Sequence, residues 1–85
     1  MNKIEIYTKD YCPYCHRAKR LLSDKGAVFI EYDLVAQPAL APQMESRAQR
    51  RTVPQIFIDD RHIGGCDDLF ALDQAGQLDP LLRHI

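Results

Sequence analysis

Two cysteines stand three positions apart, where a strand pattern gives way to a helix pattern. Before Cys12, isoleucines alternate over residues 3–7 with the period of two that predicts a β-strand. From Cys15 onward, apolar residues recur at steps of three and four, which predicts a helix whose first position is Pro13. Two thiols one helical turn apart at a helix start can form and open a disulfide without unfolding the chain. This placement therefore predicts a redox-active pair.

The start of the helix also influences the chemistry of the two thiols. N–H groups of the first turn are unpaired and the helix dipole favours negative charge there, so Cys12 is expected to react as a thiolate near neutral pH. The positive charge of Lys9 favours the thiolate further. Cys12 is expected to be partly exposed, whereas Cys15 lies one turn along, points toward the core and stays protonated. The nucleophile is therefore expected at position 12.

Length and charge describe a globular chain of one domain, residues 1–85. The hydrophobic content is 46%, and 11 basic against 12 acidic residues give a formal net charge of −1. A nucleic-acid-binding or membrane-surface protein would show a basic excess, so these classes are excluded. No stretch approaches the roughly 18 apolar residues that a membrane span needs.

Cysteine usage indicates the compartment. Three cysteines cannot all pair within the chain, and in a reducing compartment they need not. The N-terminus enters a strand directly, with no signal-peptide segment. We therefore expect a cytoplasmic monomer in which Cys12 and Cys15 act in catalysis rather than as structural residues.

The order of predicted elements indicates an α/β protein. Glycine after Lys25 ends the first helix, and a β-rich run follows, so the first two strands should be parallel with a right-handed crossover. The full prediction is strands at 3–7, 28–34, 55–58 and 61–63, helices at 13–25, about 41–50 and 66–76, a hairpin turn at 59–60, and a last helical turn at 79–82. The order β-α-β-α-β-β-α predicts a thioredoxin fold, with a four-stranded mixed sheet and helices on both faces.

Four stretches of the chain resemble those of glutaredoxins, in particular the small bacterial type with a CPYC dithiol. They are IYTK at 6–9, CPYCH at 12–16, TVPQIFI at 52–58 and HIGGCDDL at 62–69. The resemblance implies a glutathione-dependent thiol–disulfide oxidoreductase with glutathione as co-substrate and no metal. It implies as partners disulfide-bonded or glutathionylated proteins, with ribonucleotide reductase a candidate by family alone, and a role as electron donor to cytosolic reductases.

The resemblance also assigns roles near the dithiol. Cys12 matches the family nucleophile and Cys15 the resolving thiol. Lys9 matches a residue that meets the glycine carboxylate of glutathione, and Tyr14 matches a residue that lines the groove.

Two later segments match the rest of the glutathione site. Thr52, Val53 and Pro54 correspond to a loop whose proline is cis and whose valine backbone pairs with the cysteine moiety of glutathione. The segment of Gly65, Cys66 and Asp67 corresponds to the site of the γ-glutamyl end. Residue chemistry agrees, because proline leaves the preceding residue extended and a helix N-terminus offers N–H groups to a carboxylate.

Several positions leave the interpretation open. Arginines cluster at 47, 50 and 51, and the sequence does not decide whether Arg50, Arg51 or Arg47 meets glutathione. Gln49 stands where the family often has glycine, and prolines at 38 and 42 are unusual for the second helix. Cys66 is expected to be packed rather than redox-active, His16 to lie on the helix surface, and His62 and His84 to have no catalytic role.

Three other functions share individual features with this sequence. The string C-x-x-C-H at 12–16 is also the attachment signature of c-type haem, but no secretory segment accompanies it. A metal or iron–sulfur carrier could use Cys12 with glutathione to bridge a cluster between two chains, although proline after the nucleophile disfavours this. A glutaredoxin-like donor reduced by thioredoxin reductase would not need the segments that resemble a glutathione site.

Overall fold

The computed structural model describes residues 2–83, so His84 lies outside the described residues. The elements occur in the predicted order, with one short 3₁₀ turn added before the second helix. They are β1 (Ile4–Thr8), α1 (Pro13–Asp24), β2 (Ile30–Asp33), η1 (Pro38–Leu40), α2 (Ala41–Ala48), β3 (Gln55–Ile58), β4 (Arg61–Gly64), α3 (Cys66–Gln74) and α4 (Leu78–Leu82). The second strand is shorter than the predicted 28–34, because Val28 precedes the part that pairs with β1.

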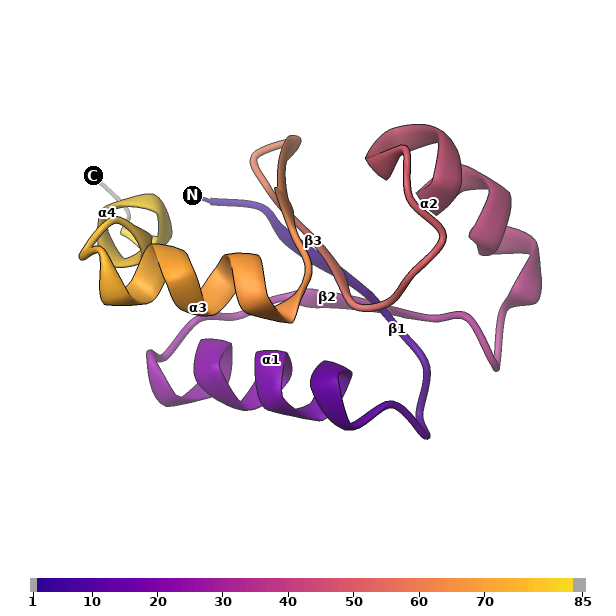
Figure 1. Ribbon diagram of the computed structural model, residues 1–85, viewed down its shortest axis with the longest axis horizontal. Coiled ribbons are helices and arrows are strands. Elements are labelled where there is room, and N and C mark those ends of the chain that lie inside the picture. Colours follow the sequence, from indigo (N-terminus) through magenta and orange to yellow (C-terminus); the bar gives the residue numbers. More distant parts are fainter. Residues whose placement is uncertain (1, 84–85) are drawn as a thin grey trace.

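The four strands form one mixed sheet in the order β2-β1-β3-β4 (Figure 1). The β1–β2 pair is parallel, as the strand–helix–strand pattern predicted, and the other two pairs are antiparallel. The β3–β4 hairpin closes through Asp59 and Asp60, both with positive φ, as expected of a two-residue type I′ turn. The thioredoxin fold predicted from the sequence is therefore confirmed.

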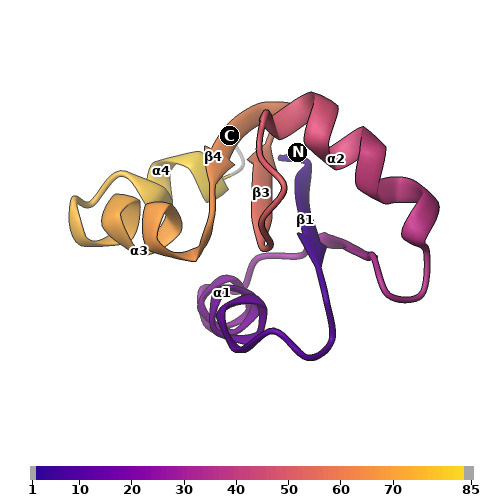
Figure 2. The same cartoon turned by 45° about the vertical axis from the view of Figure 1, so that its right-hand side comes forward.

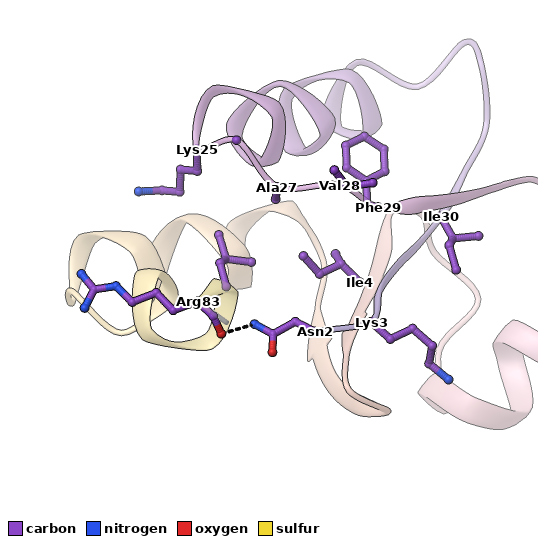
Figure 3. Close-up of a pocket in the computed structure, with 11 residues that line it drawn as sticks. Asn2, Lys3, Ile4, Lys25, Ala27, Val28, Phe29, Ile30 and Arg83 are labelled. Carbon is purple, nitrogen blue, oxygen red and sulfur yellow. Dashed lines mark hydrogen bonds between the residues drawn. The ribbon is translucent and has the colours of Figure 1, made fainter. Parts of the chain in front are cut away.

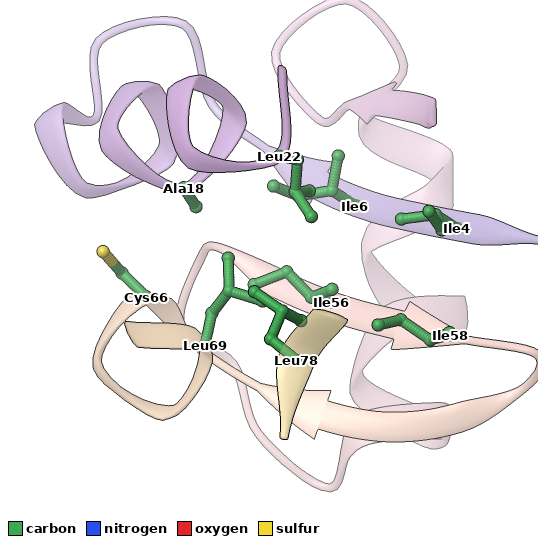
Figure 4. Close-up of a cluster of buried hydrophobic side chains, with 9 residues drawn as sticks. All are labelled: Ile4, Ile6, Ala18, Leu22, Ile56, Ile58, Cys66, Leu69 and Leu78. Carbon is green, nitrogen blue, oxygen red and sulfur yellow. The ribbon is translucent and has the colours of Figure 1, made fainter. Parts of the chain in front are cut away.

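Helices cover both faces of this sheet. Helices α1, α3 and α4 lie on one side and α2 lies on the other (Figure 2). Figure 4 shows the larger core, in which side chains of β1 and β3 meet those of the three helices on their side. Its buried members are Ile4, Ile6, Ala18, Leu22, Ile56, Ile58, Cys66, Leu69 and Leu78.

The alternation read in the first strand separates two buried faces rather than a buried face from water. Ile4 and Ile6 face the larger core, whereas Tyr7 packs with Met44 and Phe57 under α2. Every residue of β1 is buried, including Glu5. The sheet is therefore the middle layer of three, and β1 is one of its central strands.

Helices α1 and α2 are each followed by a residue in the left-handed backbone conformation. The chain leaves α1 through Gly26, whose φ of +75° is the left-handed conformation expected just after a helix. At the end of α2 the same conformation is adopted by Gln49, with φ of 58°. The glutamine thus adopts the conformation that glycine would adopt more easily. Among residues 2–83, no helix is both long and apolar enough to cross a membrane.

Candidate active site

The first turn of α1 positions Cys12. This residue is the N-cap of the helix, with extended backbone angles, and its sulfur accepts the N–H of Cys15 at 3.4 Å. On its other side the Cys12 thiol donates to the carbonyl oxygen of Val53 at 3.7 Å. The side chain is partly exposed. Cys12 is therefore reachable from solvent at the end of a helix, as the sequence predicted.

Cys15 lies one turn further along α1 and is completely buried. Burial raises the pKa of its thiol to about 12, and a backbone hydrogen bond at Lys9 acts in the opposite direction without offsetting it. The thiol is therefore protonated at neutral pH. The predicted difference in exposure between Cys12 and Cys15 is confirmed.

A loop before β3 forms the wall opposite Cys12. The peptide bond between Val53 and Pro54 is cis, as the resemblance implied. Thr52 is held by the side chain of Gln55, whose amide nitrogen donates to the Thr52 carbonyl at 3.0 Å and lies 3.2 Å from its hydroxyl. The carbonyl of Val53 therefore faces the Cys12 thiol from a loop that the side chain of Gln55 holds in place.

The N-terminus of α3 forms the third side. The carboxylate of Asp68 accepts the N–H of Gly65 at 2.9 Å and an N–H of Arg50 at 3.1 Å. The Gly65 hydrogen bond and the Arg50 guanidinium hold the pKa of Asp68 below its usual value. Gly64 has φ of +120°, and a Cβ there would collide with the Asp68 carboxylate, so only glycine is accommodated without a shift.

These three segments enclose a shallow groove of about 210 Å³. It brings together every residue predicted to bind glutathione except Lys9, and adds Arg50 and Asp68. Its lining consists of Tyr14, Arg50, Thr52, Val53, Pro54, Gly65, Cys66, Asp67 and Asp68. The groove thus joins the start of α1 to two segments that follow it by more than 30 residues in the chain.

The structure separates the three clustered arginines. Arg50 alone of them lines the groove, while Arg51 points to Glu45 at 3.4 Å. Arg47 lies on the opposite face of the sheet, where it pairs with Glu5 at 3.1 Å. The three arginines that cluster in the sequence therefore have separate positions in the structure, and only Arg50 lines the groove.

Of the residues predicted to bind glutathione, Lys9 lies outside the groove lining, whereas Cys66 belongs to it. Lys9 is partly exposed in the turn after β1, where its carbonyl accepts the N–H of Cys12 at 3.1 Å. Its side chain does not line the groove, so its predicted contact with a carboxylate stays a prediction. Cys66 is buried, and burial raises the pKa of its thiol. Its side chain extends from α3 toward α1 (Figure 4), which confirms the expectation that it is packed.

Sequence reasoning missed the supporting residues of this site. Asp68 could have been found, because it occupies the third position of α3, where a carboxylate can accept the N–H of the N-cap residue. Nothing in the sequence indicates that Gln55 and His62 support the site, since a polar residue in a short strand is usually read as solvent-facing. Among residues 2–83, no group of three or more His, Cys, Asp or Glu side chains is arranged to hold a metal ion.

A larger hollow of about 620 Å³ lies at the other end of the molecule, beside the start of β1 and the segment before β2 (Figure 3). Its walls include Ile4, Ala27 and Phe29, and the charged ends of Lys3 and Lys25 point away from it. It contains no thiol and none of the predicted site residues. Cys12 does not itself line the smaller groove, but its sulfur lies 3.7 Å from the carbonyl oxygen of Val53, which does, so we assign the reaction to that groove.

A partly exposed thiol at a helix N-cap, a buried thiol one turn later and a facing cis-proline loop define a thiol–disulfide oxidoreductase with a thioredoxin fold. Comparison with known proteins narrows this class. The sequence profile of the glutaredoxin family matches residues 4–63. The chain is 60% identical over 83 residues to glutaredoxin 3 of Escherichia coli K12, covering 98% of this chain and all of that protein. The chain belongs to the glutaredoxin family and is an enzyme, a thiol–disulfide oxidoreductase dependent on glutathione.

Solved structures agree with this assignment. The glutaredoxin–glutathione complex of buckwheat superposes with a TM-score of 0.88 at 34% identity, covering 95% of this chain and 76% of that one. A glutaredoxin of Brucella melitensis gives a TM-score of 0.81 at 52% identity, covering 98% and 94% respectively. The fold and the family therefore rest on independent comparisons of structure and sequence.

Proposed function

We propose that this enzyme reduces protein–glutathione mixed disulfides and protein disulfides, with Cys12 as the nucleophile and Cys15 as the resolving thiol. The observation that carries the proposal is the position of the Cys12 sulfur. It is partly exposed at the start of α1 and lies 3.7 Å from the Val53 carbonyl, beside the groove. A thiolate there gains from the unpaired N–H groups of the first turn.

Glutathione is proposed to bind in the groove with its sulfur toward Cys12. The backbone of Val53, the residue before Pro54, offers hydrogen-bonding groups to the cysteine moiety, and Thr52, Pro54 and Tyr14 complete the walls. A glutaredoxin from buckwheat has been solved as a glutathione complex, which supports this use of the groove.

The two carboxylates of glutathione have separate proposed partners. The N-terminus of α3, at Gly65, Cys66 and Asp67, is assigned to the γ-glutamyl carboxylate. The donors are the backbone N–H groups of Cys66 and Asp67, because that of Gly65 already donates to Asp68. The glycine carboxylate is assigned to Lys9, with Arg50 as the additional cation at the groove. Arg50 already pairs with Asp68, so its charge is partly compensated.

With a glutathionylated protein, the Cys12 thiolate attacks the glutathione sulfur. The Cys12–glutathione disulfide forms, the protein–glutathione disulfide breaks, and the protein leaves as a thiolate that takes up a proton. A second glutathione, as thiolate, then attacks the glutathione sulfur of this intermediate. Oxidised glutathione leaves and Cys12 is regenerated, so that one free glutathione is consumed and the disulfide passes from the protein to glutathione.

With a protein disulfide, Cys15 completes the reaction. Cys12 attacks one sulfur and forms a mixed disulfide with the protein. Cys15 then attacks the Cys12 sulfur, loses its proton to the departing protein thiolate, and forms the Cys12–Cys15 disulfide. Because burial raises the pKa of Cys15 to about 12, this thiol does not compete with Cys12 for the first attack. Two glutathione molecules reopen the disulfide.

The proposal is tested by an assay that couples a small glutathione mixed disulfide to glutathione reductase and NADPH. Cys12→Ser is expected to be inactive, while Cys15→Ser retains substantial activity because the first route does not use Cys15. Thioredoxin reductase in place of glutathione and its reductase is expected to support no comparable NADPH consumption. Equal inactivity of both variants would contradict the division of labour between the two thiols.

We further propose that the protein acts in the cytoplasm on disulfide-bonded or glutathionylated proteins, with ribonucleotide reductase as a candidate among the reductases it supplies with electrons. Family membership supports this assignment. Trapping with Cys15→Ser, which cannot resolve a mixed disulfide with a protein, would identify the partners. Recovery of no cytoplasmic protein through Cys12 would contradict it.

A further inference from the structure

Gln55 is a polar side chain with no exposed surface, at the start of β3 and directly beside the cis-proline loop. A buried amide lowers stability unless its donors and its acceptor are paired. In this protein they are paired on both sides. The amide nitrogen lies 3.0 Å from the Thr52 carbonyl and 3.2 Å from the Thr52 hydroxyl, and the amide oxygen lies 2.7 Å from Nε2 of His62.

This arrangement fixes which atoms donate. The carbonyl of Thr52 can only accept, so the nitrogen of the Gln55 amide must face it and the oxygen must face His62. His62 must therefore carry a proton on Nε2. The Thr52 hydroxyl, which accepts from Gln55, keeps its own proton free to donate elsewhere, and Thr52 lines the groove.

His62 is itself held in place. Its ring lies against Phe57 with centroids 5.1 Å apart, and the imidazole is partly buried on β4. Burial, and after it the nearby charge of Arg50, lowers the pKa of His62, while Asp68 acts in the opposite direction. Because Nε2 carries a proton in the neutral tautomer required here and also in the charged ring, the hydrogen bond to Gln55 is kept in both states.

We propose that Gln55 and His62 are positioning residues for glutathione: the hydrogen-bond chain His62–Gln55–Thr52 holds the loop that presents Val53 to the substrate and directs the Thr52 hydroxyl into the groove. The chain runs from β4, outside the groove lining, to the loop that faces Cys12. This rests on the proposed function, since it deepens the role of the same groove. It also gives His62 a function consistent with its having no part in the chemistry.

The test compares three variants with the wild-type enzyme. His62→Phe keeps a ring on Phe57 but removes the donor, leaving the buried Gln55 oxygen unpaired. His62→Gln restores an N–H at nearly the position of Nε2 and should rescue the effect. Leu78→Ala opens a cavity in the larger core, at a residue of α4 that does not line the groove, and controls for a general loss of stability.

In the glutathione-coupled assay, His62→Phe is expected to raise KM for a glutathionylated peptide about fivefold, with kcat within about twofold of wild type. His62→Gln should return KM to within about twofold of wild type, and Leu78→Ala should leave KM unchanged despite a lower Tm. The rate at which iodoacetamide alkylates Cys12 should stay within about twofold in His62→Phe, because that reagent does not need the groove.

A ligand-free readout separates this inference from the proposed function. The backbone amide resonances of Thr52 and Val53 should shift in His62→Phe and not in Leu78→Ala, whether or not the enzyme uses glutathione. Unchanged resonances, or an unchanged KM in an otherwise active enzyme, would overturn the positioning role. An inactive wild-type enzyme whose resonances still respond would instead contradict the proposed function alone.

Discussion

Cys12 and Cys15 carry the same chemical group, and their environments make them different reagents. The N-cap position leaves Cys12 partly exposed, with the N–H of Cys15 directed at its sulfur. One turn later, Cys15 faces the interior beside the sheet and is fully covered. Because ionisation of a buried thiol is costly, burial of Cys15 adds to the N-cap position of Cys12 in separating the reactivity of the two residues. The spacing of three residues thus determines both their contact and their inequality.

This difference predicts selective alkylation. At pH 7.5, with the protein fully reduced and iodoacetamide limiting, Cys12 should be modified while Cys15 and Cys66 remain free, because burial raises the pKa of both latter thiols. Mass spectrometry of the peptides measures each site. The urea-unfolded chain is the control, in which all three thiols should react. Modification of Cys15 in the folded protein as fast as Cys12 would contradict the assignment.

At the scale of elements, an ion pair between a buried glutamate of β1 and an arginine of α2 joins this helix to the sheet. Glu5 of β1 is buried, and Arg47 of α2 reaches it with two N–H donors at 3.1 Å. The same guanidinium lies over the ring of Phe57, 4.0 Å from its centroid, and Tyr32 donates to Glu5 at 2.8 Å. Burial raises the pKa of the Glu5 carboxyl, but the Arg47 and Tyr32 hydrogen bonds outweigh it, so the net pKa lies below its usual value.

Arg47→Met should therefore destabilise the protein, because the buried Glu5 carboxylate loses its partner. We expect a loss of about 2–3 kcal/mol of unfolding free energy at pH 7, less than for a fully buried pair because a quarter of the Arg47 side chain is exposed. Urea denaturation measures this loss. Arg51→Met is the matched control, since Arg51 is exposed and its pairing with Glu45 should contribute little.

The same pair predicts a pH dependence with a definite sign. A carboxyl whose folded pKa is lowered contributes stability above its unfolded pKa and loses it as pH falls through the folded value. The difference in unfolding free energy between wild type and Arg47→Met should thus be complete at pH 7 and shrink as the pH falls, first through the higher Glu5 pKa of the folded variant and then toward the lowered Glu5 pKa of the folded wild type. A difference that stays constant down to pH 3 would show that packing of Arg47 on Phe57, rather than its charge, stabilises the helix.

The end of α2 offers a stabilising change. Gln49 adopts a left-handed conformation that disfavours a side chain, although its amide compensates in part by donating to the Ser46 carbonyl at 2.8 Å. Gln49→Gly should raise the unfolding free energy by about 0.5–1 kcal/mol, which corresponds to about 2–8 °C in Tm. Gln49→Ala keeps the strain and removes the hydrogen bond, so it should give no gain. A lower Tm for glycine than for alanine would refute the argument.

At the scale of the whole molecule, local patterns predicted the elements and their order, because each element carries its own start and stop signals. Pro13 and Gly26 limit the first helix, and Asp59 and Asp60 form the predicted hairpin turn. The resemblance in turn supplied the residues of the groove. In contrast, nothing in the local pattern distinguishes Arg47, which pairs with the buried Glu5, from Arg50, which lines the groove.

The supporting contacts could not be predicted for a related reason. The Glu5–Arg47 pair and the Gln55–His62 contact join elements through side chains whose partners depend on the folded arrangement of sheet and helices. A charged residue in a strand pattern indicates a solvated face, and in this fold that face is covered by α2. Tertiary packing therefore decided where each polar side chain went, while periodicity decided only which backbone segment it belonged to.

The edge of the sheet formed by β2 bears on the expected monomeric state. Val28, Ile30 and Val35 are exposed at 86%, 48% and 47% near the edge strand β2, a feature that can favour association. However, β2 has only four residues and carries Glu31 and Asp33. Three apolar side chains on so short an edge provide far less than the roughly 1,200 Å² that a stable interface buries.

Light scattering on the reduced protein should therefore give the monomer mass of 9.8 kDa at all concentrations from about 10 µM to about 1 mM. Val28→Lys, which places a charge on the most exposed of these apolar residues, should leave the mass unchanged. A mass near twice that value in the wild type, returning to the monomer value in Val28→Lys, would establish β2 as a dimer interface. In that case the two short acidic strands would have to pair despite the repulsion of Glu31 and Asp33 across the interface.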